Sequence, residues 1–146
     1  MGLRVCDSFV SSLENRTVAY IKQQQSEMAI THIELGEARS KIDAARMLLH
    51  GVVDAMAEAA EKREVMEYVS RAKARTDCGF ATRLCKEAID TLYTATGGRG
   101  LADFSAIGQA FLDVQAVNMH ALITANTVFE TYGRVLVGDR SPDMHV

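Results

Sequence analysis

The 146-residue chain has only one proline, Pro142, no tryptophan and only three cysteines. Proline breaks helices and is common in turns, so its near absence favours long, uninterrupted helices over a strand-rich fold. The odd cysteine count, without a C-x-x-C pair, is typical of a reducing compartment. The sequence also lacks a membrane-spanning apolar run and the apolar start of a signal peptide. We therefore expect a cytoplasmic protein with no membrane partner.

A large excess of charge of one sign is absent too. Sixteen lysines and arginines oppose 19 aspartates and glutamates, which gives a formal net charge of −3. This balance argues against a phosphate-binding surface for DNA or RNA, so no nucleic-acid partner is expected. The apolar share of 48% and the charged share of 24% are close to globular averages. We expect residues 1–146 to form a single domain.

Apolar residues recur at helical spacing over four stretches, residues 3–22, 27–61, 64–96 and 104–137. Long helices joined by short links favour antiparallel neighbours. The predicted fold class is therefore all-α, in the form of an up-down-up-down four-helix bundle. A run of three glutamines, residues 23–25, predicts a solvated junction after the first stretch.

Metal chemistry is not indicated. Di-iron sites in helical bundles need a glutamate three residues before a histidine, and none of the four histidines has one. Cysteine and histidine do not cluster at zinc spacing either. We predict no metal site. Basic and acidic residues alternate along the third stretch, which favours a solvated helix face over a ligand surface.

The fourth stretch carries a polar strip beside its apolar stripe. At ~100° per residue, Asp113, His120 and Thr124 fall within about 40° of one line. Asp113 and His120 would be ~10 Å apart along the axis, and Thr124 would be the nearer partner of His120. Two interpretations of this strip remain: it lines a cleft beside the bundle, or it faces open solvent. Apolar residues on two faces of the stretch indicate contact with another subunit or domain.

A glycine-rich loop separates the third and fourth stretches. Gly97, Gly98 and Gly100 free the backbone for positive φ and for close approach by a ligand. A helix cap and turn would need only one glycine. Phosphate binding and a plain turn therefore both remain open.

Taken together, three segments resemble the C-terminal helical domain of the acyl-CoA dehydrogenase superfamily. The likeness is greatest to its flavin-dependent monooxygenase branch, which hydroxylates aromatic or sulfur substrates with reduced flavin from a reductase. The segments are residues 35–38 with 42–49, residues 88–101, and a last group formed by Leu112-Asp113, His120, Tyr132-Gly133-Arg134 and Gly138.

The resemblance implies a flavin cofactor, FAD or FMN, and assigns site residues. Gly97, Gly98 and Gly100 would lie against the flavin, often that of a neighbouring subunit. Arg16 falls near an arginine that binds the flavin phosphate. His120 matches a histidine that lies near flavin and substrate and assists oxygen transfer.

The sequence also departs from the family. Gln109 and Leu112 stand where arginines are usual, so the arginine partners of Asp113 in a structural Arg–Asp pair are missing. The N-terminal helical domain and the middle β-barrel domain are not in this sequence.

The function expected from the sequence is the C-terminal, flavin-proximal and oligomerising domain of a flavin-dependent oxidoreductase. Alone, the chain is expected to bind flavin weakly or not at all and to form a dimer or tetramer. The missing domains, as a separate chain, and a flavin reductase are the expected partners. The alternative is a non-catalytic helical self-association module, or a remnant of such an enzyme.

Overall fold

The computed structural model describes residues 2–14, 16–18, 20–102 and 104–139, and helices dominate them. Two strands form an antiparallel hairpin, with Thr17 opposite Gln24. The all-α class expected from the sequence is confirmed. In chain order the elements are α1 (Gly2–Ser12), β1 (Thr17–Val18), β2 (Gln23–Gln24), η1 (Gln25–Glu27), α2 (Ala29–Lys62), α3 (Tyr68–Thr96), η2 (Gly97–Leu101), α4 (Ala106–Asn118) and α5 (Ala125–Leu136), where η marks a 3-10 helix.

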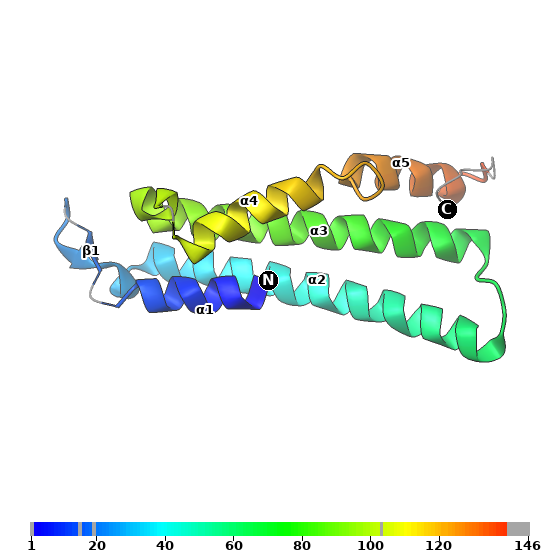
Figure 1. Cartoon of the computed structure of the whole chain (residues 1–146), viewed down its shortest axis with the longest axis horizontal. Coiled ribbons are helices and arrows are strands. Elements are labelled where there is room, and N and C mark those ends of the chain that lie inside the picture. Colours follow the sequence, from blue (N-terminus) through cyan, green and yellow to red (C-terminus); the bar gives the residue numbers. More distant parts are fainter. Residues whose placement is uncertain (1, 15, 19, 103, 140–146) are drawn as a thin grey trace.

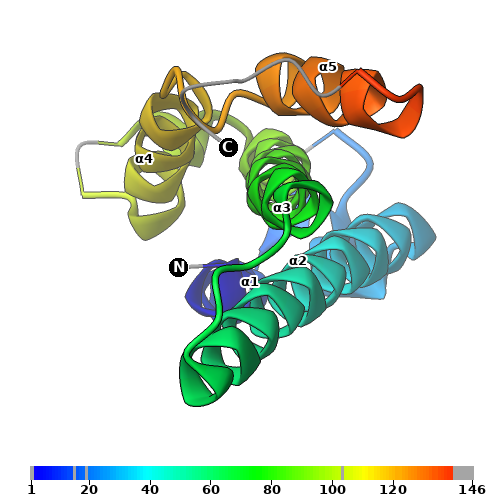
Figure 2. The ribbon, with the colours of Figure 1, turned by 90° about the vertical axis from the view of Figure 1, so that its right-hand side faces the viewer.

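The helices are arranged around α3. Helices α2 and α3 run antiparallel along the length of the molecule (Figure 1). Viewed end-on, α3 lies in the middle, with α1 and α2 on one side and α4 and α5 on the other (Figure 2). Helix α1 begins alongside the middle of α2, where a Cβ on Gly2 would lie 3.0 Å from the Ile42 side chain. The finer expectation of a four-helix bundle stays a prediction.

The main apolar core joins α1, α2, α3 and α4 near the hairpin end of the molecule. Phe9 of α1 and Ile89 and Leu92 of α3 are fully buried in it. Small residues face inward elsewhere along α3, among them Ala72, Gly79 and Ala81. Small side chains let helix axes approach closely, which explains how α3 contacts each of the other four helices.

The first predicted stretch, residues 3–22, is wrong in its second half. Helix α1 ends at Ser12, and the hairpin of β1 and β2 follows. Lys22 has a left-handed φ of 51°, a conformation that no α-helix contains. The backbone N–H of Gln25 then donates to the Arg16 carbonyl oxygen at 2.8 Å, which closes the hairpin.

The fourth predicted stretch, residues 104–137, is wrong as one helix. It is divided into α4 and α5 by residues 119–124. Thr124 has an extended backbone, with a ψ of 123°, and stands at the N-cap of α5. Its hydroxyl donates to the carbonyl oxygens of Asn118 at 3.3 Å and His120 at 2.9 Å. Of these two acceptors, the Asn118 carbonyl oxygen belongs to the last residue of α4, where a helix leaves its carbonyls without helical partners.

The alternating charges of α3 lie on a solvated face, as expected. Lys73 pairs with Asp77, and Arg83 pairs with Glu87 one helical turn on. Glu87 also meets Lys41 of α2 at 3.2 Å. Across the described part of the chain, no helix has the length and apolar character needed to cross a bilayer.

Gly79→Ala should lower the free energy of unfolding by about 1–3 kcal/mol, because it overpacks the contact between α3 and α5. Its new Cβ would lie 2.5 Å from a Val128 methyl carbon and 2.9 Å from the Ile123 carbonyl oxygen. Urea denaturation followed by circular dichroism measures the change.

The matched control is Gly36→Ala in α2, whose Cβ would meet nothing within 4 Å. This variant should be more stable than the wild type by up to about 1 kcal/mol, the difference in helix propensity. Equal effects of the two substitutions would contradict the packing described here.

Candidate functional site

The C-terminal end of α3 brings Arg16 and the glycine loop together. Arg16 Nη2 donates to the carbonyl oxygen of Thr96, the last residue of α3, at 2.6 Å. The last carbonyls of a helix have no intrahelical partners, so this guanidinium caps the helix. Gly97 follows with a φ of 63°, and a Cβ on it would lie 3.3 Å from Arg16 Nη2. The two residues predicted from separate motifs are thus direct neighbours.

The three glycines of the loop serve different purposes. Gly97 supplies the left-handed conformation and the close approach to Arg16. Gly98 is exposed, and a Cβ there would meet nothing within 4 Å. Gly100 is buried, and a Cβ on it would lie 2.9 Å from the Tyr93 ring. Only Gly97 and Gly98 therefore offer exposed backbone to a ligand.

A cavity of about 310 Å³ lies beside Arg16. Its lining residues include Arg16 and Arg99 and hydroxyl-bearing residues such as Ser12 and Ser105. Burial, followed by the positive charge of Arg99, lowers the pKa of Arg16 from its ordinary value. Arginine nevertheless stays cationic in proteins, so the cavity carries positive charge at neutral pH.

One nitrogen of Arg16, a lining residue of this cavity, lacks a hydrogen bond within the described part of the chain. Arg16 Nη1 is buried and has no hydrogen-bond partner among the described residues. A buried donor without an acceptor is costly, and an anion with several oxygens would satisfy it. The residues present therefore fit a phosphate group of the kind a flavin nucleotide carries.

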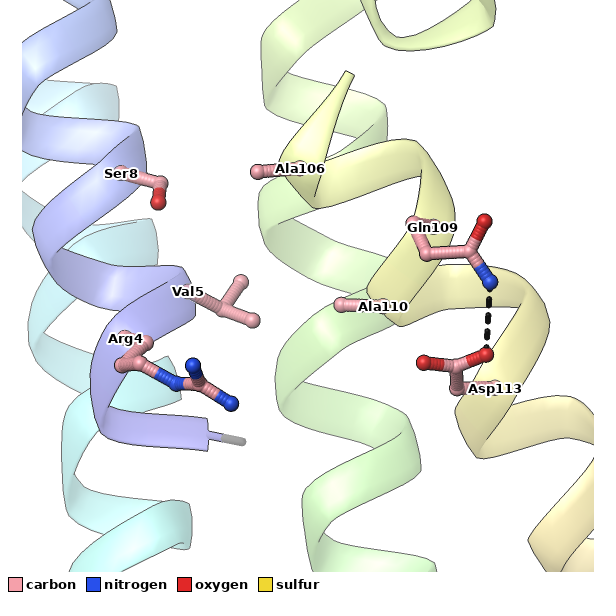
Figure 3. Close-up of a pocket in the computed structure, with 7 residues that line it drawn as sticks. All are labelled: Arg4, Val5, Ser8, Ala106, Gln109, Ala110 and Asp113. Carbon is pink, nitrogen blue, oxygen red and sulfur yellow. Dashed lines mark hydrogen bonds between the residues drawn. The ribbon is translucent and has the colours of Figure 1, made fainter. Parts of the chain in front are cut away.

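Asp113 lies in a second cavity, of about 350 Å³, between α1 and α4 (Figure 3). Gln109 Nε2 donates to Asp113 Oδ1 at 2.7 Å, so an amide one turn away supplies the contact expected from an arginine. Arg4 projects into the same cavity from α1, on the opposite wall (Figure 3). The carboxylate thus faces a cation on another helix.

His120 lies in the interruption between α4 and α5 and is exposed. The Leu122 N–H donates to its Nδ1 at 3.3 Å. With Nδ1 as acceptor, the neutral ring carries its proton on Nε2. The expectation that Asp113 and His120 share one helix face is wrong, because α4 ends between them. Thr124 bonds the His120 carbonyl oxygen, and no bond from it to the imidazole ring is seen.

The structure does not bring His120 and Arg16 together. Helix α4, with 13 residues, separates the glycine loop from the interruption, a distance of about 20 Å along its axis. A polar cavity of about 340 Å³ borders the interruption and is lined by Asn118 and Thr124, with Arg83 and Lys86 of α3. His120 is not among its lining residues.

No other reactive group stands out in the described ranges. No cluster of three histidine, cysteine or acidic side chains there could hold a metal ion. Cys6, Cys78 and Cys85 are free thiols, and desolvation by burial raises the pKa of each.

Sequence reasoning missed Gln25. The predicted solvated junction is wrong for this residue, which is only 7% exposed. Its Nε2 donates to the Ala95 carbonyl oxygen at 3.0 Å, one residue before the carbonyl that Arg16 caps. Nothing in the sequence distinguishes Gln25 from Gln23 and Gln24, although only Gln25 is buried. Arg99, inside the glycine loop, was visible in the sequence but had no assigned role.

The family described as "Acyl-CoA dehydrogenase, C-terminal domain" matches residues 2–125, and the chain belongs to this family. It is 25% identical over 128 residues to the pigment production hydroxylase of Rhodococcus sp. (strain ATCC 21145), covering 88% of this chain and 33% of that protein. It is 24% identical over 135 residues to the oxygenase component of p-hydroxyphenylacetate 3-hydroxylase from Acinetobacter baumannii, covering 92% and 32%. The chain thus spans about a third of the length of these relatives.

Solved structures agree with this relationship. The HsaA monooxygenase from M. tuberculosis aligns with a TM-score of 0.83 and 25% identity, over 97% of this chain and 36% of that one. XiaF from Streptomyces sp., solved with FADH2 and glycerol, aligns with a TM-score of 0.90 over the same shares; at 24% identity, this likeness concerns the fold alone. The resemblance inferred from the sequence, including its monooxygenase branch, is confirmed.

Proposed function

We propose that residues 1–146 form the C-terminal, flavin-proximal domain of a flavin-dependent monooxygenase. The observation that carries the proposal is Arg16, which lines a cavity together with Arg99, contacts the end of α3 beside Gly97, and has a buried Nη1 without a partner among the described residues. Membership of the acyl-CoA dehydrogenase family supports a flavin, FAD or FMN.

In this proposal Arg16 binds a flavin phosphate, and the exposed backbone of Gly97 and Gly98 lies against the nucleotide. A reduced flavin, when bound, supplies the electrons that activate dioxygen. Gly100 supports the loop from beneath, through its contact with Tyr93. Because the cavity is open and small relative to a dinucleotide, most of the flavin would be held by other domains.

We assign His120 to proton donation at the reacting end of the flavin in the complete enzyme. The Leu122 N–H occupies Nδ1, so Nε2–H is the group that His120 would offer to a substrate. The length of α4, about 20 Å along its axis, separates the glycine loop from the segment that carries His120, and this is compatible with an extended cofactor whose phosphates and ring lie apart.

Self-association is the second part of the proposal. Large apolar side chains stay exposed on the segment from α4 to α5, including Leu112 (62% exposed), Met119 (74%) and Leu136 (66%). Monomeric soluble proteins rarely leave many such groups open, so a dimer or tetramer would cover them. In that assembly α4 and α5 together would take the fourth position of an up-down-up-down bundle.

The complete enzyme would need two kinds of partner. The N-terminal helical and β-barrel domains would supply the remaining flavin and substrate walls, and a flavin reductase would supply reduced flavin. The same exposed apolar residues also favour a second candidate, a non-catalytic self-association module. Flavin titration of the chain, alone and mixed with the missing domains of a relative, separates the two candidates.

Arg16→Met should weaken FAD binding about 10- to 100-fold in the chain mixed with those domains, the effect of losing one charge-assisted contact. Fluorescence titration measures the dissociation constant. The chain alone should show weak binding or none. Arg4→Met, in the other cavity, is the control and should bind as the wild type does. Stoichiometric flavin retained by the chain alone, or equal affinities of the two variants, would refute this assignment.

His120→Ala should reduce hydroxylation turnover about 100-fold in the same mixture, within the range of general acid catalysis. Flavin affinity and the thermal melting curve should stay unchanged, because the imidazole is exposed and bonds only a local N–H. His50→Ala, a change at another exposed histidine, is the control. Full turnover by His120→Ala would remove His120 from the mechanism.

The isolated chain should be a dimer or tetramer at tens of micromolar in light scattering coupled to gel filtration. Introducing charge into the exposed apolar surface, as in Leu136→Glu, should shift the equilibrium towards the monomer, since burying an unpaired charge is costly. A wild-type chain that is monomeric at this concentration would contradict the prediction.

A further inference from the structure

Gln25 is an unusual buried residue in this fold. The other polar residues classed as buried in the described part of the chain are all threonines, Thr31, Thr76, Thr96 and Thr131. A threonine in a helix can satisfy its hydroxyl on the preceding turn, as Thr96 does on Leu92. A carboxamide has four hydrogen-bonding positions and needs partners from elsewhere.

The partners of Gln25 lie at the end of α3. Its Nε2 donates to the Ala95 carbonyl oxygen at 3.0 Å, and its backbone N–H donates to the Arg16 carbonyl oxygen at 2.8 Å. Arg16 in turn donates to the Thr96 carbonyl oxygen at 2.6 Å. Two hydrogen bonds thus join the hairpin to two successive carbonyls at the end of α3, directly before Gly97, and the third bond ties Gln25 to Arg16.

The other end of the same carboxamide has no partner. Gln25 Oε1 is buried without a hydrogen bond among the described residues. An unsatisfied buried acceptor destabilises the fold, so a close-packed apolar side chain would serve stability better at this position. What the amide contributes at this position is the bond from its N–H group to the Ala95 carbonyl oxygen.

We propose that Gln25 is the positioning residue of the Arg16 site: it fixes the hairpin against α3 so that Arg16 and the Gly97–Gly98 backbone stay in register for a phosphate-bearing ligand. This inference rests on the proposed function. Gln25 does not line the cavity and acts only through Arg16 and Ala95. Its contribution is preorganisation, because a site held in its binding geometry loses less conformational freedom when the ligand arrives.

The chemistry of the position explains why an amide suits it. A lysine would add a second positive charge behind Arg16, and a carboxylate would face the Ala95 carbonyl oxygen without an N–H to donate. A neutral donor long enough to reach Ala95 satisfies the helix end and leaves the charge of the cavity to Arg16 and Arg99.

The test compares Gln25→Met, of similar volume but without hydrogen bonds, with Gln25→Glu, which keeps the shape and loses the amide donor. Gln23→Met in β2 is the matched control, since Gln23 is exposed in the same hairpin. Two measurements are made on the full chain: amide hydrogen exchange along the backbone, and calorimetric titration with inorganic pyrophosphate.

Both Gln25 variants should exchange the Gly97 and Gly98 amides about fivefold faster than the wild type, roughly the effect of one hydrogen bond. Exchange in the middle of α2 and α3 should be unchanged. Pyrophosphate affinity should fall by a similar factor, about fivefold, and the control should match the wild type in both measurements.

Two results would overturn the proposal. In the first, both Gln25 variants have the same loop exchange rates and the same pyrophosphate affinity as the control. The other is faster exchange spread evenly over α2 and α3, which would assign Gln25 to general stability. If the wild type shows no saturable pyrophosphate binding, the exchange measurement alone decides the role of Gln25, and the flavin titration with the added domains decides the proposed function.

Discussion

Close packing against the small residues of α3 is the constraint on which the rest of the structure depends. Gly79 admits Val128 of α5, and fully buried Ala88 lies in the core shared with α1, α2 and α4. Because neighbours lie on both sides of α3 (Figure 2), its C-terminal end is the place where the hairpin, the glycine loop and the start of α4 can meet. The position of the candidate anion site thus follows from helix packing.

Helix termination and ligand chemistry use the same groups at this end. Any helix leaves its last carbonyls without partners, and here side chains 70 and 80 residues away in sequence satisfy two of them. Arg16 needs only part of its guanidinium for this task, and Nη1 is left over. A helix cap built from a charged side chain therefore also brings a positive charge to the cavity and leaves one N–H group of that side chain without a hydrogen bond to the described residues.

The sequence predicted the long elements well and the interruptions poorly. Residues 27–61 and 64–96 were identified within a few residues of α2 and α3, since sustained apolar periodicity is a strong signal. The break at Thr124 was missed because no glycine or proline marks it, although threonine is a common N-cap. Arg16 came from family resemblance, and Gly97 and Gly98 came from the glycine-rich loop together with that resemblance. Burial of Gln25 depends on tertiary contacts that no local pattern records.

The interruption before Thr124 also separates α5 from the helices that share the main core. The main core cluster contains residues of α1 to α4, and none of its described members belongs to α5. Helix α5 is held instead by its own contacts with α3, such as the bond from the Thr76 hydroxyl to the Val128 carbonyl oxygen. A segment with a separate set of contacts opens with its own, smaller free energy. We therefore expect α5 to open before the Arg16 end of the molecule does.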